Sequence, residues 1–191
     1  MNKWFFGILL LAFCAACKSK KKKKADVDNR DFFPALSFLQ SQVKEIDTSL
    51  YSIQKIETIN GRSDTSFIPR EEFRNYAKDF LEIPDITQEK WKGDYVETTD
   101  YDTDMGRAVL VYSAMDPELE LRQQHVTILP TLGGNDEVKS IFLHRIINDE
   151  DSTVEKKMYW EVKNYFTITS IVQKEDSPEQ IRKLQVFWKG F

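Results

Sequence analysis

The sequence predicts an α+β fold: an antiparallel meander sheet of about seven or more strands, with two N-terminal amphipathic helices packed on it. Three observations support this prediction. Apolar residues recur at helical spacing only before residue 85, strand-length segments fill the chain from Tyr95 onward, and short turn-forming sequences separate those segments. Connections of this length join antiparallel neighbours, and they leave no room for the crossover helices of a parallel sheet.

The first helix is expected over residues 32–46. Asp31 is its candidate N-cap, and Pro34 fits the first turn, where a missing N–H matters little. The second helix is expected to begin near Pro69 and to end at Pro84. The apolar positions that recur every three or four residues are Phe32, Leu36, Leu39, Val43 and Ile46 in the first helix and Phe73, Tyr76, Ala77, Phe80 and Leu81 in the second.

Between the helices, strands over Leu50–Ile59 and Thr65–Ile68 flank Asn60-Gly61, a dipeptide suited to a tight hairpin turn. Seven further strands are expected at Tyr95–Tyr101, Arg107–Ala114, Leu119–Leu129, Val138–Ile147, Glu155–Val162, Tyr165–Gln173 and Ile181–Trp188.

Two of these strands carry apolar residues on both faces, at Ala108–Tyr112 and Ile141–Ile147. Strands of this kind are normally covered on both sides. Helices can cover one face of the sheet, so the other face needs sheet curvature, a ligand or a partner.

The strand Leu119–Leu129 contains a conflict of parity. Leu119 and Leu121 are odd-numbered, whereas Val126 and Ile128 are even-numbered, so a regular strand would place one pair on the wrong face. An inserted residue corrects such a mismatch, and the polar run from Arg122 to His125 is the expected place for this β-bulge. The alternative is a regular strand that is buried on both faces.

The N-terminus has the layout of a secretory signal. Lys3 supplies one positive charge, and residues 4–16 are apolar and uncharged. At ~1.5 Å rise per residue this stretch reaches only about 20 Å, less than the ~30 Å hydrocarbon core of a bilayer, which argues against a membrane-spanning helix. The chain is therefore expected to divide into a signal peptide (1–16), a segment with Cys17 and a lysine-rich tether (17–30), and one α+β domain (31–191).

Ala15-Ala16-Cys17 resembles the lipobox that the lipoprotein signal peptidase reads. In that family, small residues precede a cysteine whose thiol carries a diacylglyceryl group, which implies lipidation of Cys17. Cys14 stands where the family usually has Leu, and ordinary secretory cleavage after Ala16 is the alternative. Because the signal removes Cys14 and the lipid occupies Cys17, no disulfide can form in the mature chain.

The tether carries six lysines, Lys18 and Lys20–Lys24. The whole chain has a net charge of −4, but without Lys3 and these six lysines, 20 basic residues face 31 acidic ones, a balance of −11. We expect this basic segment to follow anionic headgroups, with a merely solvated spacer as the alternative. An acidic domain in this compartment does not fit nucleic-acid binding.

Other motifs point to no catalytic, cofactor or metal site. Asp100, Asp102 and Asp104 match the start of a calcium loop, but Met105 and Val111 occupy the positions that need Gly and Glu, so a solvated turn is favoured. His125 and His144 have no zinc-ligand spacing, and acid–base chemistry with a carboxylate is the less favoured alternative to a structural role.

Three segments, at residues 31–34, at residues 56–61 and in the last strand with its tryptophan, resemble small lipoproteins of Bacteroidota whose activity is not characterised. That resemblance implies a location and no activity. The lysines after Cys17 depart from the acidic residues of surface-exported members, which favours the outer membrane, facing the periplasm. We expect a non-catalytic role, binding an envelope protein or acting as a scaffold. The alternative is a carrier or chaperone for an apolar ligand held between sheet and helices.

Overall fold

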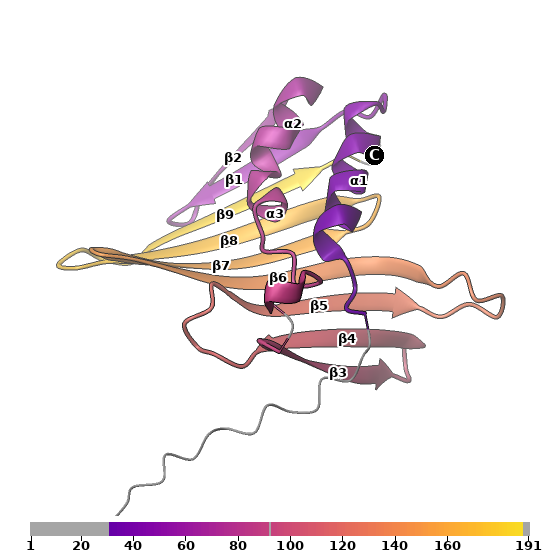
Figure 1. Cartoon of the computed structure of the whole chain (residues 1–191). Coiled ribbons are helices and arrows are strands. Elements are labelled where there is room, and N and C mark those ends of the chain that lie inside the picture. The colour runs from indigo at the N-terminus through magenta and orange to yellow at the C-terminus, as the bar shows by residue number, and fades with distance from the viewer. Residues whose placement is uncertain (1–30, 92, 189–191) are drawn as a thin grey trace, which may run out of the picture.

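The computed structural model describes residues 31–91 and 93–188. The predicted signal peptide, Cys17 and the lysine tether lie outside these residues. The fold is α+β, built on one antiparallel sheet of nine strands in the order β2-β1-β9-β8-β7-β6-β5-β4-β3 (Figure 1). The strands are β1 Gln54–Ile59, β2 Arg62–Phe67, β3 Tyr95–Asp102, β4 Arg107–Ala114, β5 Leu121–Leu129, β6 Glu137–Asp149, β7 Ser152–Glu161, β8 Tyr165–Lys174 and β9 Gln180–Phe187.

The sheet is a meander from β3 to β9, and the hairpin of β1 and β2 extends it beyond β9. All seven strands expected after Tyr95 are present, so the predicted meander is confirmed. The hairpin turn is also confirmed, because Asn60 and Gly61 connect β1 to β2 with φ angles of 47° and 82°. A two-residue turn with both φ angles positive matches the twist of the strands that it joins.

Three α-helices lie on one side of the sheet, α1 Ala35–Asp47, α2 Arg70–Tyr76 and α3 Lys78–Leu81 (Figure 1). We call this side the inner face and the opposite side the outer face. Among the described residues, no helix is long and apolar enough to cross a membrane.

Two helix details differ from the predictions. Helix α1 begins at Ala35 with Pro34 at its N-cap, so Asp31 is not the cap and Pro34 is not in the first turn. Phe32 lies before the helix, and its ring packs on that of Tyr112, with centroids 5.1 Å apart. The second predicted helix is two short helices that meet at Ala77.

The strand expected from Leu50 begins only at Gln54, and Leu50 is 94% exposed.

The core between helices and sheet is filled by aromatic rings. Phe73 contacts the rings of Trp160, Phe166 and Trp188, and Phe80 contacts those of Trp160 and Phe166, with ring centroids 5.2–6.3 Å apart. The three sheet rings also contact one another, with centroids 5.1–6.1 Å apart. All five side chains are at most 1% exposed. Large rings in mutual edge and face contact fill this part of the core.

The predicted bulge in β5 is confirmed. Leu121 pairs with Arg145 of β6, but Gln123 pairs with the very next β6 residue, His144, so Arg122 is the extra residue. As a result Leu121 and Val126 are both fully buried on the inner face despite their opposite parity. A second shift follows, where Thr127 pairs with Ser140 and Ile128 with Val138, which leaves Lys139 as an extra residue on β6.

Candidate docking face

The helices lie on one side of the sheet and leave its outer face uncovered (Figure 1). Buried inner-face residues alternate with half-buried outer-face residues along the central strands: Ile141 and Leu143 of β6 are fully buried, whereas Phe142 between them is only half-buried. The sequence predicted that this strand would be covered on both sides. Within the described residues the helices cover one side only, so sheet curvature, a ligand or a partner remains to account for the outer side.

A row of rings crosses this outer face, formed by His125, Phe142, Tyr159, Tyr165 and Phe187, one from each of strands β5 to β9. We call it the aromatic stripe. Ring centroids are 5.2 Å apart for His125 and Phe142, 5.9 Å for Tyr159 and Tyr165, and 5.5 Å for Tyr165 and Phe187. Phe142 and Tyr159 stand directly opposite each other in the β6–β7 register. All five side chains are half-buried, which leaves part of each ring open to solvent.

Burial affects the two tyrosines of the stripe. It raises the pKa of Tyr159 and of Tyr165, and the Glu161 carboxylate adds to the increase in both. The Tyr159 hydroxyl donates to Glu161 Oε2 at 3.3 Å. Both phenols are therefore neutral hydroxyls at physiological pH, able to donate and accept hydrogen bonds.

Beside the stripe, the Glu155 carboxylate pairs with two neighbouring side chains. Glu155 Oε1 lies 3.1 Å from Lys157 Nζ and 2.8 Å from His144 Nε2. The hydrogen bond from Lys157, together with His144, holds the pKa of the Glu155 carboxyl below its usual value, although partial burial opposes this. The structure thus brings a histidine and a carboxylate together, but on an open sheet face and not in a cleft, so the geometry does not suggest acid–base catalysis.

Strand β5 carries buried polar atoms on two side chains. Arg122 Nε and Nη1 and His125 Nε2 are buried and have no hydrogen-bond partner in the part of the chain that the structure describes. Desolvation lowers the pKa of His125, which keeps its imidazole neutral at pH 7.

On the inner face, a polar network joins α3 to the sheet. Arg145 of β6 is only 5% exposed, and it donates to Glu120 through Nε at 3.0 Å and also through Nη2. Its Nη1 donates to the backbone oxygen of Asp79 at 3.0 Å, and the Asp79 carboxylate pairs with Lys156 at 2.6 Å. Every charged group here has a partner, so the network serves to dock α3.

A hollow of about 420 Å³ lies where the chain enters the domain. Its wall is formed by the entering segment and by strands β3 and β4, through Asp31, Phe32, Phe33, Pro34, Glu97, Leu110 and Tyr112. The Phe33 backbone N–H donates to the Tyr112 hydroxyl at 3.0 Å, and the Gln124 side chain donates to the Phe33 carbonyl at 3.4 Å. These bonds fix the point at which the chain leaves the domain toward residue 30.

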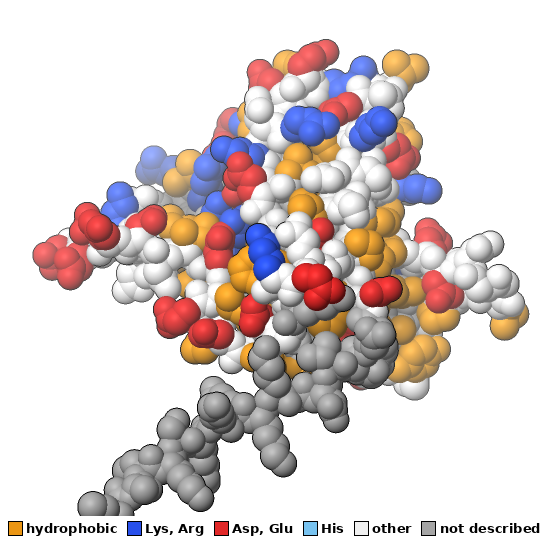
Figure 2. All heavy atoms as spheres, viewed as in Figure 1, with side chains coloured by type: hydrophobic (Ala, Val, Ile, Leu, Met, Phe, Trp, Pro, Cys, Tyr) orange, Lys and Arg blue, Asp and Glu red, His pale blue; other side chains and the backbone are white. Residues whose placement is uncertain are grey.

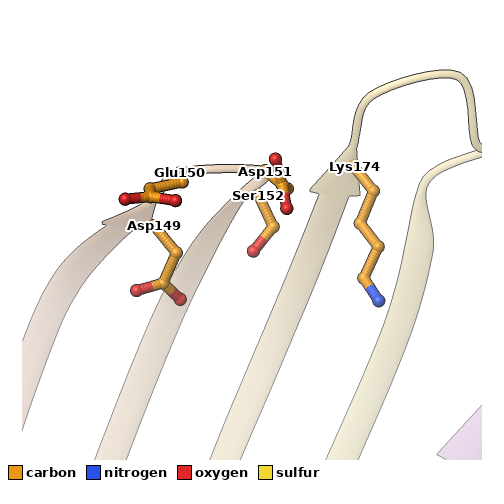
Figure 3. Close-up of a pocket in the computed structure, with 5 residues that line it drawn as sticks. All are labelled: Asp149, Glu150, Asp151, Ser152 and Lys174. Carbon is orange, nitrogen blue, oxygen red and sulfur yellow. The ribbon is translucent and has the colours of Figure 1, made fainter.

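Another hollow lies at the β6–β7 turn. Asp149, Glu150 and Asp151 come from this one turn, and Lys174 comes from the end of neighbouring β8 (Figure 3). Acidic side chains also gather over this end of the sheet in the space-filling view (Figure 2). Among the described residues, no three His, Cys, Asp or Glu side chains are placed as metal ligands.

The Asp100, Asp102 and Asp104 run forms the end of β3 and the turn that follows it. Asp102 Oδ1 accepts hydrogen bonds at 3.0 Å from the backbone N–H groups of Asp104 and Met105, an arrangement typical of a turn.

The two histidines, His125 and His144, lie on the same outer face of adjacent strands, which their sequence spacing alone did not indicate.

The sequence prediction did not identify the aromatic stripe or the Arg145 network. A signal for the stripe was present, because Tyr159, Tyr165 and Phe187 occupy positions between the inner-facing residues of strands β7 to β9. No signal of that kind marked Arg145, whose partners lie 25 and 66 residues away.

Comparisons of the chain with protein-family profiles, with curated proteins and with solved structures found no match.

Proposed function

We propose that this protein is a lipid-anchored cell-envelope protein, held in the outer membrane facing the periplasm by a lipid on Cys17, with a non-catalytic partner-binding or scaffold role. The observation that carries the binding part is the uncovered outer face beside a filled core. An apolar sheet face that a domain leaves uncovered on one side is typical of an interaction site.

In this proposal helices α1, α2 and α3 close the inner face and leave the outer face for a partner. The exit point at Phe33 supports tethered presentation, because the chain toward Cys17 leaves beside β4, away from the centre of the stripe. The lysines of the tether add attraction to anionic lipid, about 1 kcal/mol each near a membrane surface.

The anchor is tested by Cys17→Ser. A serine hydroxyl cannot form the thioether, so the variant should take up no labelled fatty acid and should leave the membrane fraction. Cys14→Ser is the matched control, since Cys14 lies within the segment that is removed, and its label should persist. Label on the Cys17→Ser variant would contradict the lipid assignment.

A further inference from the structure

Strand β2 is one edge of the sheet, and its far side pairs with no described strand (Figure 1). The Ile68 N–H donates to the Ile53 carbonyl at 3.0 Å, which makes these two residues a hydrogen-bonded pair. Such pairs recur at every second residue of an antiparallel ladder, so alternate residues of β2 bond to β1 and those between them direct their backbone groups away from the sheet. The residues whose N–H and C=O groups point away from the sheet are Ser63, Thr65 and Phe67.

The strand itself has none of the common features that prevent a second strand from pairing with such an edge. Proline, lysine and bulges are the usual protection. The pairing of β1 with β2 is regular over the whole strand, and β2 contains neither Pro nor Lys. All of its residues except Ser66 are exposed, and Phe67 exposes 67% of its surface. Strand β2 is therefore open to the addition of another strand.

One register makes β2 complementary to a second copy of itself. Antiparallel pairing about a two-fold axis requires residues with outward backbone groups to stand opposite one another. With Thr65 opposite Thr65 of the second copy, Ser63 stands opposite Phe67, so every outward N–H and C=O of the strand is paired. Asp64 then stands opposite Ser66, whose hydroxyl can donate to the carboxylate.

The two neighbouring registers are less favourable. If Ser63 stood opposite Thr65 of the second copy, the two Asp64 carboxylates would face each other, and like charges directly opposite are destabilising. If Thr65 stood opposite Phe67, Ser63 would face Pro69, which has no N–H to donate. The sequence of β2 thus favours the register centred on Thr65.

We propose that two copies of this protein pair through β2, antiparallel and with Thr65 on the two-fold axis, so that their sheets join into one. The chain enters each domain beside β3 and β4, at the opposite end of the strand order, so the segments toward residue 30 lie away from this contact. A single pair of strands is a small interface, and we expect the dimer to form at high protein concentration. This inference goes beyond the proposed function and depends neither on the anchor nor on a partner for the outer face.

Disulfide trapping tests the register. The full chain with Cys14→Ser and Cys17→Ser has neither of its two native cysteines, and Thr65→Cys is added to it. Opposing Cα atoms of a hydrogen-bonded pair are about 5.5 Å apart, within the range that a disulfide spans. Mild oxidation should therefore give a covalent dimer, seen by non-reducing electrophoresis.

Ser63→Cys in the same background is the matched control. Ser63 and its copy are offset by four residues in this register, about 14 Å along the strand, which is too far for a disulfide. We expect about tenfold less covalent dimer from this variant than from Thr65→Cys. A mixture of Ser63→Cys with Phe67→Cys should cross-link again, because these two positions stand opposite each other.

A second measurement removes the pairing without a cysteine. The Thr65 N–H points away from β1, so Thr65→Pro keeps the β1–β2 ladder and removes a donor of the proposed contact. Sedimentation equilibrium should show a dimer for the parent and a monomer for this variant, with thermal melting as the check of its fold.

Thr99→Pro makes the same change on the other edge strand, β3. The Met115 N–H donates to the Asp94 carbonyl at 2.8 Å, so by the same alternation the Thr99 N–H also points away from the sheet. This variant should dimerise like the parent. The inference is overturned by a parent that stays monomeric, by equal cross-linking at Thr65 and Ser63, or by a dimer that Thr65→Pro does not weaken. None of these results bears on the lipid anchor, which fatty-acid labelling tests separately.

Discussion

Arg145 is the single charged side chain among the buried residues of the described chain, and all of its contacts run to α3 or to the start of β5. Arg145→Met keeps the length of the side chain but leaves Glu120 and the Asp79 carbonyl without their donor. Because Glu120 is 43% exposed, water can partly replace that donor. We therefore expect a loss of about 2 kcal/mol in the free energy of unfolding, measured by urea denaturation.

The matched control for this substitution is Arg182→Met. Arg182 also pairs with a glutamate, Glu57, at 2.6 Å, but its side chain is 55% exposed. An exposed ion pair contributes at most about 1 kcal/mol. Equal losses for the two variants would contradict a docking role for Arg145.

His125 should make the stability of the domain depend on pH. Desolvation lowers its pKa in the folded state below the ordinary 6.5, so the unfolded chain binds a proton first as the pH falls. The free energy of unfolding should therefore decrease from pH 7 toward pH 5, and His125→Gln should reduce that decrease. Thr127→Val, a change on the same strand and face without an ionisable group, should leave the pH dependence of the free energy of unfolding unchanged. Urea denaturation at several pH values measures this dependence. The same dependence for the parent and for His125→Gln would count against a buried neutral imidazole.

At the scale of the elements, strand β5 shows which structural features could be predicted from the sequence. Conflict between the parities of Leu121 and Val126 was sufficient to predict the bulge, because a strand that buries one face must keep one parity there. The second irregularity, at Lys139, could not be predicted in this way. It lies beside a loop of turn-forming residues, so it creates no conflict of parity within the strand. Helix α1 likewise followed from its apolar spacing, but its start did not, because Phe32 packs on Tyr112, 80 residues away, and not on the helix.

The bulge residue gives a direct test at this scale. Deleting Arg122 would remove the extra residue and make β5 continuous, with Leu121 still opposite Arg145 and buried on the inner face. We therefore expect this deletion to cost clearly less than Leu121→Ala, which truncates a fully buried side chain and should cost about 2–5 kcal/mol, by chemical denaturation.

The control deletion is Gly133, an exposed residue of the loop between β5 and β6, where no Cβ would meet another atom. A shortened surface loop should be tolerated, and the Arg122 deletion should resemble it more closely than Leu121→Ala does. A loss for the Arg122 deletion as large as that for Leu121→Ala would contradict the assignment of Arg122 as the extra residue.

At the scale of the whole molecule, the strongest contrast is between a basic tether and an acidic domain. Replacing Lys18 and Lys20–Lys24 with glutamine should leave the melting temperature nearly unchanged, because a solvated tether contributes few contacts to the folded state. Adsorption to anionic vesicles should fall for this variant, and the difference from the parent should shrink at high salt. Lipid-free chains in a flotation assay, together with a melting curve, measure both effects. A large loss of thermal stability would show that the lysines pack on the domain.

The two edge strands of the sheet, β2 and β3, differ in how they resist aggregation. No described strand pairs with the open side of β2 or of β3. Strand β3 ends in Asp100 and Asp102, so two copies of this edge repel each other, and such charges are a known protection of free edges. Strand β2 has mostly uncharged residues and an exposed Phe67. Fibres or end-to-end chains of this protein would therefore begin at β2, and a lysine in place of Thr65 is the single change best placed to prevent them.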